Sequence, residues 1–128
     1  MPIDVRWYDD QQTILHMSEN GAWTWDDFYA ARQQADEMLK QVAYKAHVII
    51  EATHGNIPSN AMTHFRASRM SNHGLTVLVG PRAFSRIMYN VYLRIAGKQH
   101  EASFRMASTI EEALDIIAEW EAVNELKE

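Results

Sequence analysis

The sequence has no cysteine, which removes disulfide bonds, thiolate nucleophiles and cysteine-based zinc sites from consideration and fits a reducing compartment. No apolar run approaches the roughly 20 residues that a membrane-spanning helix needs, and the N-terminus lacks the charged-then-apolar pattern of a signal peptide. Linkers, repeats and low-complexity segments are also absent. We therefore expect a soluble, cytoplasmic protein whose 128 residues form one domain, 1–128.

Charge is spread unevenly along the chain. The net charge is −5, yet the stretch from Arg66 to Arg105 holds seven basic residues and a single acidic one, Glu101. Blocks of one sign are typical of solvated faces. An acidic domain disfavours nucleic-acid binding, because phosphates are neutralised by basic residues. Without an anchoring segment, membrane association is disfavoured as well.

The first 45 residues predict a hairpin followed by a helix. Apolar and polar residues alternate over Ile3–Tyr8, a polar turn follows, and Thr13–Met17 reads as a second, antiparallel strand. Thr24 with Asp27 three residues later is typical of a capped helix start. The apolar residues that follow at helical spacing are Phe28, Ala31, Ala35, Met38, Leu39 and Val42.

The remainder predicts alternating strands and helices. His47–Ala52 and Leu75–Val79 are continuous apolar runs, as expected for central parallel strands that are covered on both faces. Ala102–Met106 alternates, so this strand has a wetter face or lies nearer an edge. Ser108 and Thr109 precede a final amphipathic helix, which buries Ala113, Leu114, Ile117 and Trp120. The predicted order is β-β-α-β-α-β-α-β-α.

Three stretches in this order resemble a known family. They are the glycine-to-acidic entry into the first helix at 21–28, the strand Leu75–Gly80 and the acidic, alanine- and leucine-containing start of the last helix at 109–117. The chain is similar, over nearly its whole length, to SpoIIAA-like members of the STAS (sulphate transporter and anti-sigma-factor antagonist) superfamily. The resemblance implies an α/β fold with a mixed sheet of about five strands and four helices. It also implies a non-enzymatic, regulatory interaction or ligand-binding role.

A parallel α/β sheet places its ligand site at the carboxyl ends of its strands. The predicted strand His47–Ala52 runs into a polar loop, 53–60, and then a short helix. The candidate ligand or partner residues in this region are Thr53, His54, Asn56, Ser59, Asn60 and Met62. A second loop with Gly80, Arg82 and Phe84 precedes another helix, whose start could hold a small anion through backbone N–H groups.

Ser59 has two interpretations. In anti-sigma-factor antagonists of this superfamily a phosphorylatable serine lies in the corresponding loop, so the resemblance implies a candidate phosphosite at Ser59. A phosphate there would add nearly two negative charges at a helix N-terminus. Pro58 precedes Ser59 and Asn60 follows it, and neither the family's acidic residue nor its glycine is present. The residues themselves favour a helix cap through the hydroxyl group.

Methionine and aromatic residues suggest an alternative ligand-binding role. Flexible apolar side chains near the predicted carboxyl edge suit either ordinary core filling or a small apolar or amphipathic ligand. The residues concerned are Met62, Phe65, Met70, Met88 and Met106.

The predicted third helix is apolar on two sides. Beyond its core stripe it carries a second arc with Tyr89, Tyr92 and Leu93. A helix that is apolar nearly all round is usually buried on both sides. This arc therefore predicts a contact, and we expect a homodimer, since symmetric dimers are the commonest assembly.

No catalytic motif is present. Six histidines are available, but none has the spacing of a metalloprotease, and the nucleophile elbow, phosphate-binding loop and dinucleotide turn are all missing. The sequence predicts neither an enzyme nor a cofactor or metal site. The expected partners are a second copy, a regulatory protein or a small apolar ligand.

Overall fold

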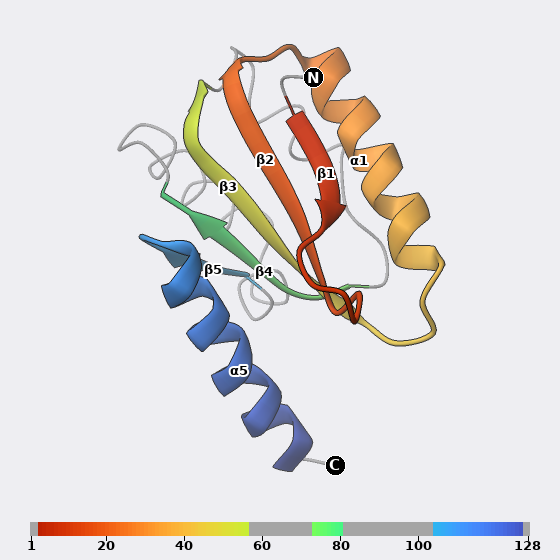
Figure 1. Cartoon of the computed structure of the whole chain (residues 1–128), viewed down its shortest axis with the longest axis vertical. Coiled ribbons are helices and arrows are strands. Elements are labelled where there is room, and N and C mark those ends of the chain that lie inside the picture. Colours follow the sequence, from red (N-terminus) through yellow and green to blue (C-terminus); the bar gives the residue numbers. More distant parts are fainter. Residues whose placement is uncertain (1–2, 57–72, 81–103, 127–128) are drawn as a thin grey trace.

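Residues 3–56, 73–80 and 104–126 are described by the structure, which is a computed structural model. Five strands form one sheet in the order β1-β2-β3-β4-β5 (Figure 1). β1 is antiparallel to β2, and the other neighbours are parallel. The strands are β1 (Ile3–Trp7), β2 (Ile14–Ala22), β3 (Ala46–Asn56), β4 (His73–Val79) and β5 (Phe104–Ala107).

Two helices in the described part cover opposite faces of this sheet, α1 (Trp25–Lys40) and α5 (Ile110–Leu126). Side chains alternate between the faces of a strand, and the two cores follow this alternation. Leu15 and Val48 pack in the core under α1, whereas Ile14 and Ile49 pack in the core under α5. The prediction of a mixed α/β sheet with an opening hairpin is therefore confirmed.

The strand and helix predictions are mostly confirmed at the level of elements. β3 is the central strand and β5 lies at an edge, as the apolar patterns indicate. The predicted inward residues Ala113 and Ile117 of α5 are buried, and Trp120 packs beside them. The two further helices predicted between the parallel strands fall in 57–72 and 81–103, outside the described residues.

Several predicted strand boundaries were wrong. The second strand, predicted to end at Met17, continues as β2 to Ala22. β3 continues through Thr53, His54 and Asn56, which we predicted to lie in a loop, because this segment pairs with the end of β2. β4 begins at His73, two residues before the apolar run, because it already pairs there with Ala46. In β3 and β4 strand pairing overrides a sequence with low strand propensity.

The hairpin turn is organised by one carboxylate. Asp9 accepts hydrogen bonds from the backbone N–H groups of Thr13 (2.9 Å) and Ile14 (3.1 Å), and also from the Thr13 hydroxyl. Gln12 has a φ of 58°, which completes the tight reversal. These contacts fix the start of β2 and therefore its register against both neighbours.

α1 begins with a complete capping box. Thr24 Oγ1 accepts from the N–H of Asp27 at 3.2 Å, and the Asp27 carboxylate accepts from the N–H of Thr24 at 2.9 Å. The helix lies alongside the outer strand β1 (Figure 1). The Gln34 amide donates to the Val5 carbonyl at 3.4 Å.

Candidate functional site

The carboxyl end of the sheet carries a projecting two-stranded ribbon. Asn20, Gly21 and Ala22 of β2 pair with His54–Asn56 of β3, beyond the last residues that pair with β1 and β4. Figure 1 shows these two strand ends extending past their neighbours. We call the segments 20–22 and 54–56 the ribbon. The three β2 residues of the ribbon are exposed to solvent.

The ribbon is offset from the rest of the sheet by an irregularity in pairing. Ser18 pairs with Glu51, but Asn20 pairs with His54, so β3 holds one extra residue at this point. Bulges of this kind bend a strand and recur next to functional sites. Gly21 has a φ of 67°, a conformation that favours glycine, and no atom of the described residues lies within 4 Å of the place where its Cβ would be. The ribbon is therefore bent and open on this side.

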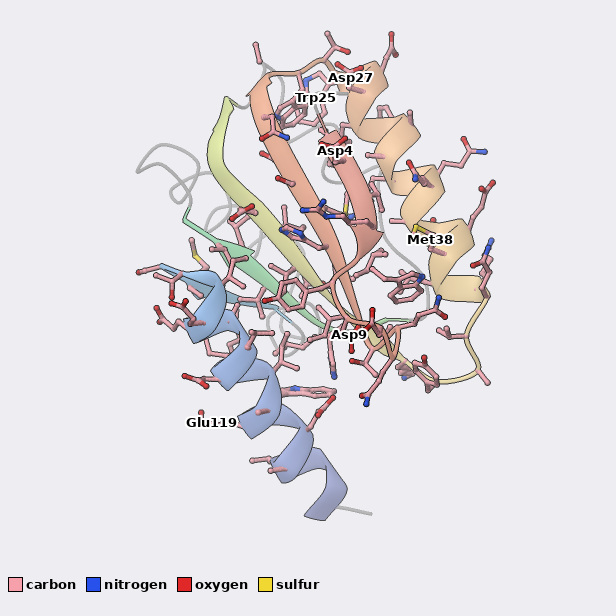
Figure 2. All side chains as sticks on the ribbon, in the orientation of Figure 1. Asp4, Asp9, Trp25, Asp27, Met38 and Glu119 are labelled. Carbon is pink, nitrogen blue, oxygen red and sulfur yellow. The ribbon has the colours of Figure 1, made fainter. Side chains whose placement is uncertain are left out.

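An aromatic cluster packs at the base of the ribbon, where β2 turns into α1. Trp23 stacks on Phe28 with ring centroids 5.8 Å apart, and Trp25 meets Trp23 edge-on at 5.1 Å. Figure 2 shows Trp25 and Asp27 at the start of α1, at the same end of the molecule as the ribbon. Tyr29 continues the cluster to the surface, where it is 37% exposed. Aromatic surfaces with an exposed rim are typical of interaction sites.

Glu19 is a buried carboxyl group that interacts with Trp23 of this cluster. It is only 7% exposed and lies opposite Ile3 of β1, which belongs to the core under α1. Burial raises the pKa of Glu19 to about 7, and the indole N–H of Trp23 opposes the rise. Nε1 of Trp23 is itself buried, and no residue in 3–56, 73–80 or 104–126 offers it a hydrogen bond of ordinary geometry.

A second polar group occupies the opposite face of the sheet. His16 Nε2 lies 3.4 Å from Glu51 Oε1, and the Ser18 hydroxyl donates to the same oxygen at 3.4 Å. Burial lowers the pKa of His16 despite the attraction of Glu51, and Arg6 lowers it further. The imidazole is therefore mostly uncharged at neutral pH, so its approach to Glu51 is not a strong ion pair.

Gly80, the first residue of the predicted second loop, follows β4 with a φ of 60°. Its N–H donates to the carbonyl of Ala107 at 2.8 Å. This donor is therefore occupied, and an anion at this loop would depend on donors after Gly80. Arg82 and Phe84 lie outside the described residues.

The remaining predicted site residues divide into two groups. Thr53, His54 and Asn56 lie in β3, so two of them contribute backbone to the ribbon. The loop residues Ser59, Asn60 and Met62 and the proposed dimer residues Tyr89, Tyr92 and Leu93 fall outside the described residues.

Glu19 was missed by the sequence interpretation because the second strand was predicted to end at Met17. The alternation of Leu15 and Met17 toward the core, continued by two residues, would have placed Glu19 inward.

The sequence matches no family model and no curated protein. Its structure, however, superposes on the anti-sigma factor antagonist SpoIIAA in its unphosphorylated form with a TM-score of 0.61 and 14% sequence identity. The match covers 91% of this chain and 96% of that protein. The chain has a SpoIIAA-like fold.

This structural match confirms the resemblance seen in the sequence at the level of the SpoIIAA-like fold. Within residues 3–56, 73–80 and 104–126, no three histidine or carboxylate side chains gather where they could hold a metal ion. Neither α1 nor α5 is long and apolar enough to cross a membrane. The ribbon and the aromatic cluster lie together at the carboxyl edge of the sheet.

Proposed function

We propose that this chain is a non-enzymatic regulatory domain that binds a protein partner at the carboxyl edge of its sheet. The ribbon carries the proposal, because its β2 residues Asn20, Gly21 and Ala22 are exposed beyond the body of the sheet. Its SpoIIAA-like fold supports a regulatory role, since the similar protein is an anti-sigma factor antagonist.

The aromatic cluster gives this edge the character of an interaction surface. Interfaces are enriched in aromatic side chains around a buried centre with a polar rim. Here Trp25 is half-buried and Tyr29 reaches the surface, while Asp26 and Asp27 lie in the first turn of α1. A partner that covers the ribbon would meet both the apolar rings and these carboxylates.

The test compares two exposed positions at opposite ends of the sheet. Ala22→Arg places a long charged side chain on the ribbon, and Gln11→Arg places the same side chain in the β1–β2 turn at the far end. The tagged full chain is used to capture proteins from its own cells, and the captured protein is then purified and titrated. We expect Ala22→Arg to weaken binding at least tenfold and Gln11→Arg to leave it unchanged. Equal binding by both variants would show that the partner does not use this edge.

Phosphorylation is the second candidate for this regulation, favoured by the likeness to a protein solved in an unphosphorylated form. Ser59 is the residue concerned, and a genomically adjacent protein kinase is the reagent. Phosphate incorporation into the wild-type chain, lost in Ser59→Ala, would support an anti-sigma-factor antagonist. If phosphate is transferred neither to the wild-type chain nor to Ser59→Ala, phosphorylation of Ser59 does not regulate partner binding.

A further inference from the structure

Glu19 is a buried carboxyl group that lacks a cation among the described residues. Its cross-strand neighbour is Ile3, and its side chain shares the face of Leu15 and Met17 that packs under α1. A buried carboxylate without a partner is strongly destabilised, so such a group keeps its proton to a higher pH. The pKa of about 7 follows from this burial.

The charged groups named below on β1, β3 and α1, the described elements nearest Glu19, do not compensate it. Asp4 and Arg6 of β1 lie on the other face of the sheet. There Asp4 accepts a hydrogen bond from the Asn20 amide, and the charge of Arg6 lowers the pKa of His16. Glu51 of β3 also lies on that face, beside His16. On α1, Asp27 is engaged in the capping box, Asp26 is exposed, and the Arg32 guanidinium lies 5.6 Å from the centroid of the Phe28 ring.

Trp23 is the complementary group. It is 4% exposed, and its Nε1–H donor meets no acceptor in hydrogen-bond geometry among the residues that the structure describes, although Glu19 is close enough to interact with it. A buried donor without an acceptor destabilises the folded chain. One hydrogen bond between the Glu19 carboxylate and this indole N–H would satisfy both groups.

We propose that Glu19 and Trp23 form a proton-operated contact at the base of the ribbon. When the Glu19 carboxyl group is protonated, it stays among the apolar side chains and the indole N–H is unbonded. When it releases its proton to solvent, the carboxylate accepts a hydrogen bond from Trp23 Nε1–H and draws the indole toward β2. Because Trp23 stacks on Phe28 and meets Trp25, this movement is transmitted to the start of α1.

The consequence for regulation rests on the proposed function. If a partner binds the ribbon and the aromatic cluster, its affinity follows the protonation state of Glu19. The contact itself requires no partner, so it is tested on the isolated chain, and its failure is distinguishable from failure of the partner hypothesis.

The experiment follows the indole ¹H–¹⁵N resonances of the four tryptophans from pH 5.5 to 8.5, with Trp23→Phe used for assignment. We expect the Trp23 resonance to move downfield with a midpoint near pH 7, as its N–H gains a charged acceptor. Glu19→Gln should abolish this movement. His16→Gln should retain it, which separates Glu19 from the titratable group on the opposite face.

A Trp23 resonance that does not move, or that moves equally in Glu19→Gln, would overturn the proposal. Should Glu19→Gln fail to fold, the carboxyl ¹³C resonance of Glu19 in the wild-type chain provides the second measurement. A midpoint near 4.5, the ordinary value for glutamate, would also overturn it.

Discussion

His47 Nε2 and Glu121 Oε1 lie 2.8 Å apart and join the first residues of β3 to the second half of α5. The other ring nitrogen, Nδ1, accepts the backbone N–H of Leu75 at 2.9 Å. An Nδ1 that accepts cannot carry a proton, so Nε2 carries it and donates to the carboxylate. The ring lies where the β3–β4 register shifts, and it supplies the acceptor for Leu75 at that irregularity.

Replacing His47 should therefore cost more than replacing Glu121. His47→Ala leaves the buried N–H of Leu75 without its acceptor, at about 1–3 kcal/mol, and also removes packing against Trp120. Glu121→Gln, at a side chain that is 49% exposed, should cost less than about 1 kcal/mol. Urea unfolding of both variants measures the difference. Equal costs would mean that the Leu75 contact contributes little.

Gly74→Ala should destabilise the same corner. A Cβ at this position would lie 2.6 Å from His47 Nδ1 and 2.8 Å from Cε1, and the ring is held by bonds at both nitrogens. Overpacking of this kind typically costs about 1–3 kcal/mol. In a His47→Ala background the clash disappears, so the cost of Gly74→Ala should fall sharply. If Gly74→Ala destabilised the His47→Ala background as much as the wild type, the clash with the His47 ring would not be the cause.

Asp9 should make the hairpin turn acid-sensitive. Burial raises the pKa of Asp9, but the hydrogen bonds from Thr13 and Ile14 together outweigh it and lower the pKa below 3.8. A lowered carboxyl pKa contributes stability above its ordinary value, and this contribution is lost as the pH falls through the folded pKa. Asp9→Asn should be less stable than wild type at pH 7, and the gap should narrow below about pH 4. Asp10→Asn, at the exposed neighbour, is the control and should stay within about 0.5 kcal/mol.

Thr24→Ala should weaken the start of α1 by about 1 kcal/mol, because the N–H of Asp27 loses its capping oxygen. Thr24→Ser retains the hydroxyl and should restore most of the loss. Thermal unfolding of the three chains checks the order. If the serine variant were as unstable as the alanine variant, the threonine methyl group rather than the cap would be responsible.

Glu19 should give the opposite pH dependence from Asp9. Its pKa is about 7 in the folded chain and 4.5 as an ordinary glutamate, so the folded state binds the proton more tightly between these values. Stability is then fully present below pH 4.5 and falls as the pH rises to 7, by up to about 3 kcal/mol. Glu19→Gln should remove this slope and exceed the wild type in stability at pH 8. If the free energy of unfolding of the wild type and of Glu19→Gln, measured with denaturant, changed with pH in the same way, the raised pKa of Glu19 would be contradicted.

The local patterns of the sequence predicted most helices and strands, whereas pairing between strands determined where β2 and β3 end. Alternation located the hairpin, and Thr24 with Asp27 located the start of α1. His54, Gly55 and Asn56 do not indicate a strand by composition, yet they pair with Asn20, Gly21 and Ala22. Glu19 was missed for a related reason: glutamate is rarely buried, and only the register of β2 shows that it faces the core.

The contact between Gln34 and the Val5 carbonyl bears on how the sheet can grow. Outer strands with free backbone groups invite pairing with other chains, which leads to aggregation. Tyr8 N–H bonds to Ile14 on the inner side, so by the alternation of antiparallel pairing the Val5 carbonyl points outward, where the Gln34 amide covers it. A peptide pairing with β1 at Val5 would first have to displace this amide. The same helix that begins beside the ribbon thus opposes sheet extension at this point of β1.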